Sequence, residues 1–269
     1  MLRTLYITLT CFALTASSPQ PRSAAEIGAI PAPQGFVRTA EAAASFAGYI
    51  RSLPLSADNT VYLYNGRKKD NQDAQYAVVE MDIGSRDLQQ CADAVMRIRA
   101  EYLYAQRNYG AIRFTFTSGD PAPFRMWMNG ERPAIVRGRA VWRKTAKPDT
   151  SYRTFREYLT TVFRFCGTAS LEKELMPVSS PQNIRIGDVI IKGGFPGHAV
   201  LVVDKAVRPS DNAVMVMLAQ SYMPAQSIHV LRNPGNRGSP WYEVPVAGGA
   251  LITPEWAFDW SNLKRFDER

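Results

Sequence analysis

Apolar and polar positions along this chain repeat with two different periods, which predicts both helices and strands. Apolar residues recur at three- and four-residue intervals over residues 40–53, 85–106, 152–165 and 170–175, the spacing of amphipathic helices. Shorter apolar or alternating runs predict strands, and these cover residues 61–64, 76–83, 112–117, 198–207 and 213–222. The mixture indicates an α+β fold.

Two further segments have weaker patterns. Residues 124–128 precede Asn129-Gly130, a pair typical of a hairpin turn. Residues 239–260 are aromatic and irregular, so we expect a packed closing segment there.

The stretch over residues 187–204 is expected to hold a reactive side chain. An apolar run, a glycine- and proline-rich turn and a second apolar run predict two strands, with His198 at the start of the second. The chain has two histidines, His198 and His229. Acid–base chemistry near neutral pH is therefore expected to pass through His198.

The hairpin that follows would bring a polar partner to this histidine. If Val207 faces Ala213 across the turn, Gln220 lies one diagonal step from His198 on the same face of the sheet. A slip of one residue would bring Ser221 to that face instead.

The predicted helix over residues 85–106 carries a cysteine near its start. Asp87 is a suitable N-terminal cap with Gln90 three residues on, which places Cys91 in the first or second turn. The unpaired N–H groups and the positive end of the helix dipole are expected to lower the pKa of the thiol. Cys91 also lies on the apolar side of the helix, so a small core residue is the alternative interpretation.

Together these residues suggest a nucleophile with its base. Cys91 would be the nucleophile, His198 the base, and Gln220 the amide that orients the imidazole. The backbone N–H of Cys91 is the expected oxyanion donor, with Gln89 or Gln90 as alternatives.

The remaining candidates have structural interpretations. Cys166 is expected to be a buried thiol or, alternatively, a disulfide partner of Cys91. His229 lies in an apolar stretch and is expected to be structural, while Asp93 and Asp204 are expected to cap or pair. Two histidines without clustered cysteines form no metal-ligand set, and no cofactor is expected.

The first residues have the pattern of an export signal. A positive start, an apolar run over residues 5–14 and small residues after it predict a secretory signal over residues 1–25, followed by a linker at residues 26–35. Cys11 allows a lipid anchor as an alternative. We therefore expect a secreted or periplasmic protein of the cell envelope. Its single domain would cover residues 36–269, with an insertion at about 107–186.

Composition narrows the function further. The chain has 269 residues, of which 46% are hydrophobic, enough for one sizeable core, and no stretch after the signal is long enough to span a bilayer. The formal net charge is +8, and removal of a signal with two arginines leaves +6, which suits anionic polymers. The basic residues are scattered without interleaved aromatics, which argues against nucleic-acid binding.

Four segments carry a resemblance to a known family, and they are Asp-Leu-Gln-Gln-Cys-Ala-Asp-Ala-Val-Met-Arg (87–97), Gly-Gly-Phe-Pro-Gly-His-Ala-Val (193–200), Ala-Gln-Ser-Tyr-Met-Pro-Ala-Gln (219–226) and Ser-Pro-Trp-Tyr (239–242). Over nearly all of its mature length the chain resembles a family of secreted bacterial proteins that is numbered 4846 among domains of unknown function. Helix-borne Cys91, then Gly-Asp-Val-Ile (187–190) before strand-borne His198, then a polar residue on the next strand, also resemble the papain-like cysteine peptidases. The likeness is strongest to their NlpC-type cell-wall branch and the related amidases.

The second resemblance covers the three catalytic-type positions and their flanks. It implies a papain-like core in which the helix bearing Cys91 packs on an antiparallel sheet bearing His198. It also implies a hydrolase of peptide or amide bonds with a cell-wall fragment as substrate, in which His198 holds the thiolate as an ion pair and then protonates the leaving amine. The chain departs from the compact peptidases in its longer insertion and in Gln220, where His, Asn or Asp is more common.

A non-catalytic descendant of this fold is the alternative hypothesis. It would bind a cell-wall or glycan fragment through aromatic residues such as Trp127, Trp241 and Tyr242. A structural partner in an envelope complex is a third hypothesis. Fast alkylation of Cys91 below pH 7 would favour the enzyme. The sequence indicates no particular oligomeric state.

Overall fold

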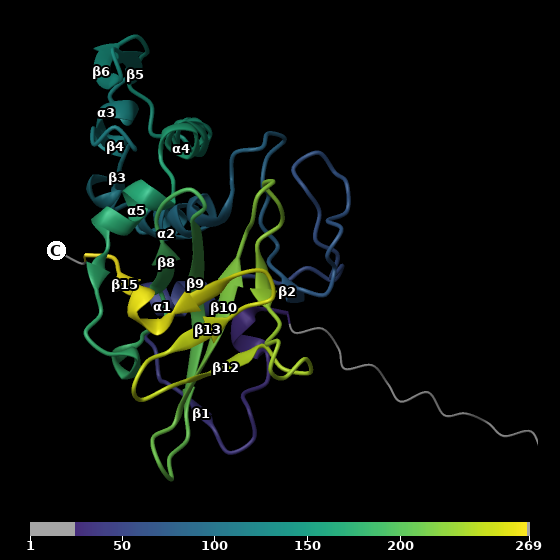
Figure 1. Ribbon diagram of the computed structural model, residues 1–269. Coiled ribbons are helices and arrows are strands. Elements are labelled where there is room, and N and C mark those ends of the chain that lie inside the picture. Colours follow the sequence, from purple (N-terminus) through teal and green to yellow (C-terminus); the bar gives the residue numbers. More distant parts are fainter. Residues whose placement is uncertain (1–24, 268–269) are drawn as a thin grey trace, which may run out of the picture.

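An antiparallel sheet organises the fold. In the part of the chain that the structure describes, residues 25–267 of a computed structural model, this sheet has nine strands (Figure 1). Its hydrogen-bonded order is β2 (Gln75–Val78), β11 (His229–Leu231), β10 (Val214–Gln220), β9 (His198–Val207), β8 (Val189–Lys192), β15 (Leu263–Arg265) and β7 (Met176–Pro177). The other two strands are β1 (Val37–Arg38), which pairs with β9, and β12 (Trp241–Val244), which pairs with β10. The predicted α+β class is confirmed.

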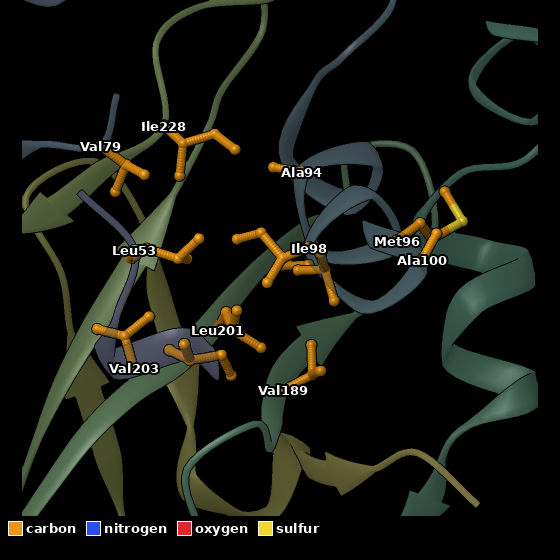
Figure 2. Packing of buried hydrophobic residues seen from close by; sticks show 14 of the residues in the cluster. Leu53, Val79, Ala94, Met96, Ile98, Ala100, Val189, Leu201, Val203 and Ile228 are labelled. Atoms are coloured by element: carbon orange, nitrogen blue, oxygen red, sulfur yellow. The ribbon is translucent and has the colours of Figure 1, made fainter. Parts of the chain in front are cut away.

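Helices cover one face of this sheet, and α2 (Cys91–Ala105) lies directly against β9 (Figure 1). On its other side α2 contacts α4 (Tyr152–Phe165) and α5 (Thr168–Glu174), while α1 (Phe46–Arg51) packs on both α2 and β9. Figure 2 shows Ile98 of α2 pointing toward Leu201 of β9, with Met96 and Ala100 on the opposite side of the helix. Because α2 is buried on both sides, the residue at its start is held in a fixed place.

The opposite face of the sheet has its own apolar layer. Side chains alternate along β9, so Leu201 faces α2 whereas Val200 faces away from it. The hairpin of β13 (Ala250–Ile252) and β14 (Ala257–Asp259) completes this second layer. His198 is two residues from Val200 on the same strand, so its side chain lies on the same face of the sheet, the face that the β13–β14 hairpin covers.

The segment from the end of α2 to the end of α5 forms a lobe beside the sheet. Its elements before α4 and α5 are η2 (Tyr109–Ala111), β3 (Arg113–Thr115), β4 (Pro121–Pro123), α3 (Phe124–Met128), β5 (Glu131–Val136) and β6 (Arg139–Lys144). β3 pairs with β4 and β5 with β6, and in Figure 1 these hairpins extend past α5, away from the sheet. Short 3-10 helices elsewhere in the described residues are η1 (Ile27–Ala29), η3 (Pro181–Asn183) and η4 (Trp260–Asn262).

A bulge sets the register of the β9–β10 hairpin. Beside the turn, Val207 pairs with Val214, one residue beyond the expected partner Ala213. The register then shifts midway along β10, so that Leu201 pairs with Ala219, as the predicted register requires. One extra residue at the turn is thus offset by one extra residue at the bulge.

Several predicted elements differ in length or type. The helix predicted over residues 40–53 is confined to α1, and residues 61–64 form isolated bridges rather than a strand. Residues 124–128 form the short helix α3, so Asn129-Gly130 ends a helix instead of closing a hairpin. The hairpin turn lies at Arg137-Gly138, where both residues have positive φ. The helix predicted over residues 152–165 has the bounds of α4.

The predicted linker at residues 26–35 is partly buried in the fold. Ile27 and Ile30, within the predicted linker at residues 26–35, are buried in the main apolar cluster. The predicted signal over residues 1–25, including Cys11, lies outside the described residues except for its last position. Among residues 25–267, no helix has the length and apolar character needed to cross a membrane.

Candidate active site

Cys91 is the first residue of α2, so the helix starts later than its sequence pattern suggests. The cap is Gln90, whose backbone N–H donates to Asp93 Oδ2 at 3.0 Å. Asp87, the expected cap, accepts instead from the backbone N–H of Ala225 at 2.7 Å. The helix begins at the cysteine because Asp93 supplies the acceptor for its first turn.

The Cys91 thiol is half-buried and lies close to several backbone N–H groups. Burial, followed by the nearby Asp93 carboxyl, raises the pKa of the thiol to about 11. The N–H groups of Ala199, Ala92 and Cys91 itself act in the opposite direction but are outweighed. The expected lowering of the thiol pKa is therefore wrong, and the resting group is a neutral thiol.

A glycine-rich loop between β8 and β9 positions His198. Thr168 Oγ1 at the start of α5 donates to the carbonyl oxygen of Gly194 at 3.3 Å, which ties the loop to the helical layer. A Cβ at Gly197 would overlap both Thr168 Oγ1 and the carbonyl oxygen of Gly194. Only glycine at position 197 therefore lets the loop pack this closely before His198 begins β9.

The imidazole of His198 is oriented by Gln220. His198 Nε2 lies 2.7 Å from Gln220 Oε1, and Gln220 Nε2 donates to Glu255 Oε2 at 2.8 Å and faces His229 Nε2 at 3.4 Å. Because the amide nitrogen has two acceptors, the amide oxygen must face His198. The network then assigns the proton of His198 to Nε2 and leaves the lone pair on Nδ1.

Aromatic rings enclose His198. The centroid of its ring lies 4.7 Å from that of Tyr222, 5.4 Å from that of Trp256 and 5.7 Å from that of Phe258. Burial lowers the pKa of His198 to about 4, although Gln220 and the charge of Glu255 partly oppose the shift. The imidazole is therefore neutral at pH 7.

Cys91 and His198 line the same cavity, whose volume is about 730 Å³. The loop of residues 194–197 also lines it, so the cavity lies beyond the end of the sheet where β9 begins. This position explains how residues from opposite faces of the sheet share one space. The structure thus brings the expected nucleophile and base to one cavity, with Gln220 behind the imidazole.

The second cysteine also lines this cavity. Cys91 and Cys166 are both free thiols, so the alternative of a disulfide between them is wrong. Cys166 Sγ donates to the carbonyl oxygen of Thr115 at 3.3 Å, and burial raises the pKa of this thiol. Among the described residues, Asp93 Oδ1 is a buried oxygen without a hydrogen-bond partner, and Asp93 also lines the cavity.

Three residues behind Gln220 were not expected to belong to the site: Glu255, Lys69 and His229. Lys69 Nζ lies 2.5 Å from Glu255 Oε2 in a largely buried ion pair. Lys69 falls in a polar run and Glu255 in the irregular closing segment, 186 residues apart, so no local pattern pairs them. His229, expected to be structural, donates from Nδ1 to the carbonyl oxygen of Ser227 at 2.9 Å and presents Nε2 to Gln220.

The three expected oxyanion donors have different surroundings. Gln89 Oε1 accepts from Arg97 Nη1 at 2.9 Å, while Gln89 Nε2 is buried without a partner. Gln90 lines the cavity, but its Nε2 donates to Asp87 Oδ1 at 3.0 Å. Of the three, the backbone N–H of Cys91 is the candidate oxyanion donor that lies close to the thiol.

Other candidates are part of the core. Asp204 is fully buried and pairs with Arg38 and Arg51 at 2.6 and 2.7 Å. Trp127, Trp241 and Tyr242 are likewise buried, so they form no exposed face on which a glycan could stack; their exposed fractions are 6%, 2% and 3%. Residues 25–267 contain no group of three or more His, Cys, Asp or Glu side chains that could hold a metal ion.

Comparison with known proteins identifies a family. The model of a family described as a domain of unknown function (4846) matches residues 28–265, and the chain belongs to that family. No curated protein and no solved structure matches the chain.

Proposed function

We propose that this member of the family is a cysteine hydrolase that cuts a peptide or amide bond through Cys91, His198 and Gln220, on a papain-like core of the NlpC type. One arrangement supports the proposal. A thiol at a helix N-terminus shares a cavity with an imidazole that an amide 2.7 Å away holds in a single tautomer. Export to the cell envelope and a cell-wall fragment as substrate, both expected from the sequence, are part of the same proposal.

His198 acts first as a base, because the resting thiol and imidazole are both neutral. This differs from the preformed ion pair expected from the sequence. His198 Nδ1 takes the thiol proton as the sulfur attacks the carbonyl carbon, and the backbone N–H of Cys91 faces the resulting oxyanion. The C–N bond then breaks, and the leaving nitrogen takes the proton from His198.

The acyl thioester left on Cys91 is hydrolysed by water. His198 takes a proton from the water as its oxygen attacks the thioester carbonyl, and returns that proton to the departing sulfur. The products are a carboxylic acid, an amine and the free thiol. Gln220 keeps Nδ1 directed at the cavity in both halves of the reaction.

A non-catalytic binding domain is the second candidate. The raised pKa of Cys91 and the lowered pKa of His198 both disfavour a thiolate. Its ligand would enter the cavity beside Cys91, since Trp127, Trp241 and Tyr242 are buried.

Cys91→Ala distinguishes the two candidates, with Cys166→Ala as a matched control because it removes another thiol from the same cavity. Purified peptidoglycan and a library of N-acyl peptides are incubated with each protein, and products are identified by mass spectrometry. We expect hydrolysis by the wild type and by Cys166→Ala, none by Cys91→Ala, and an acyl adduct on Cys91 in the intact mass. No product from any of the three proteins would favour the binding domain, and equal product from all three would exclude Cys91 as the nucleophile.

A further inference from the structure

The cavity beside Cys91 is mostly apolar away from the thiol. Six of its lining residues have large apolar side chains: Phe116, Ile135, Phe163, Phe165, Phe195 and Met223. Among the described residues, its titratable lining side chains other than His198, Tyr222 and the two cysteines are Asp93 and Arg164. Asp93 is buried at the start of α2, where it accepts from the backbone N–H of Gln90, and Arg164 is exposed at the surface. The interior therefore favours an uncharged occupant.

Apolar side chains also surround the entrance. Phe195 is 94% exposed, Met223 62% and Ile135 44%, and all three line this cavity. They come from the β8–β9 loop, the segment after β10 and the lobe strand β5, which meet at this cavity. Large apolar residues exposed together at the mouth of a cavity are typical of a surface that an apolar ligand covers.

The position of His198 assigns a direction to the substrate. His198 must give its proton to the leaving group, and the rings around it belong to Tyr222, Trp256 and Phe258. Phe116 packs instead on Phe165, with ring centroids 5.3 Å apart, in the lobe that ends with α5. The leaving group therefore lies on the His198 side, and the acyl group extends toward the lobe.

We propose that this cavity binds a long aliphatic or aromatic acyl group, so that the substrate is an apolar acyl chain joined through its carbonyl to a more polar leaving group. The inference rests on the proposed function, since it takes Cys91 as the nucleophile. It adds that the lobe, which the sheet does not need for its pairing, determines acyl specificity. Each methylene buried in the cavity raises kcat/KM about fourfold, because its transfer from water is favourable.

A series of p-nitrophenyl esters tests the acyl side alone, because the leaving group is constant. The wild type is assayed with acetyl, butyryl, hexanoyl and octanoyl esters below their micelle concentrations. We expect kcat/KM to rise at least about 100-fold from acetyl to octanoyl. Cys91→Ala measures the background, and Val246→Asp, at an exposed residue outside the cavity, should keep both the rate and the chain-length dependence.

Two variants change the cavity without touching Cys91 or His198. Ala169→Phe fills it from α5, and Met223→Asp places a charge at its mouth; Val246→Asp, at a residue that is 82% exposed and outside the cavity, is the matched control. We expect the octanoyl-to-acetyl ratio of kcat/KM to fall at least about tenfold in both cavity variants and to stay at the wild-type value in Val246→Asp. Met223→Asp decides the matter if Ala169→Phe does not fold, since Met223 is a surface residue.

The outcomes separate the two proposals. Hydrolysis that depends on Cys91 but not on chain length overturns the acyl specificity and leaves the cysteine hydrolase intact. If no ester is hydrolysed, the fluorescence of 11-(dansylamino)undecanoic acid is titrated with wild type and Met223→Asp. Binding that Met223→Asp weakens at least tenfold supports an apolar-acyl site without the hydrolase, and no binding by the wild type overturns the inference.

Discussion

Gln220 donates from its amide nitrogen to Glu255 Oε2 across 2.8 Å, and this bond determines which end of the amide faces His198. Rotated by half a turn, the amide would present its NH₂ group to His198 and favour the tautomer with the proton on Nδ1. That tautomer could not accept the proton of Cys91. Glu255 touches neither the thiol nor the imidazole, so it is a positioning residue that acts through Gln220.

Glu255→Gln should therefore impair the proposed reaction without unfolding the protein. We expect kcat to fall about tenfold with little change in KM, because a hydrogen bond to a charged acceptor is weakened. Since the charge of Glu255 raises the pKa of His198, the acid limb of the pH–rate profile should move to lower pH. Nitrogen chemical shifts of His198 would report the change of tautomer independently of any activity.

Glu243→Gln is the control for this change, since Glu243 is exposed on β12. It should leave the pH profile and the nitrogen shifts as in the wild type. A lower melting temperature for Glu255→Gln with an unchanged profile and unchanged shifts would mean that Glu255 is only structural.

Gly197→Ala tests the loop that positions His198. The added methyl group would overlap the backbone of Gly194, so the loop must move, and overpacking of this kind costs about 1–3 kcal/mol. We expect a lower free energy of unfolding in urea. We also expect slower hydrolysis of any substrate that the wild type cleaves. Gly110→Ala is the matched control, because nothing lies within 4 Å of its added Cβ. Equal stability of the two variants would contradict the close packing of the loop.

Local patterns were sufficient for parts of the fold and site. Helix periodicity gave the bounds of α4, because Ser151 caps it and one face is apolar throughout. The glycine-rich turn placed His198 at the start of β9, and period-two alternation placed Gln220 within reach of it. These features depend on residues close in sequence or on one hairpin.

Features that depend on distant contacts were missed. The pair of Lys69 and Glu255 joins two irregular segments, and no periodicity identifies either residue. The start of α2 was placed too early because Asp87 is used by the distant Ala225. The thiol pKa was predicted from the helix dipole alone, whereas burial against the rest of the fold decides its sign.

Acid stability should depend on the buried histidine His229. Burial lowers its pKa to about 3 in the folded protein, against an ordinary value of 6.5. The unfolded chain therefore binds more protons between these values, so this contribution to stability is complete above pH 6.5 and is lost as the pH falls toward 3. Between pH 7.5 and pH 5 the loss amounts to about 2 kcal/mol.

His229→Gln should show a smaller decline of the free energy of unfolding between pH 7.5 and pH 5, even if its stability at pH 7.5 is lower. Urea unfolding at several pH values measures this slope. Ile228→Val is the control, since it shortens the neighbouring buried side chain without removing a titrating group. Parallel slopes for wild type and His229→Gln would show that His229 is protonated in the folded state as well.

The reactivity of Cys91 should be limited by its neighbour Asp93. After burial, the Asp93 carboxyl is the largest cause of the raised thiol pKa, because a negative charge nearby opposes a thiolate.

Asp93→Asn retains an oxygen that can accept from the Gln90 N–H and removes that charge. In a Cys166→Ala background, we expect the pH midpoint of Cys91 alkylation to fall by about one unit. Asp211→Asn, at an exposed turn that does not line the cavity, should leave the midpoint unchanged from the wild type. Wild-type alkylation that is already fast below pH 7 would mean that Cys91 is a thiolate at rest, and the reaction would then start from an ion pair rather than from proton transfer to His198.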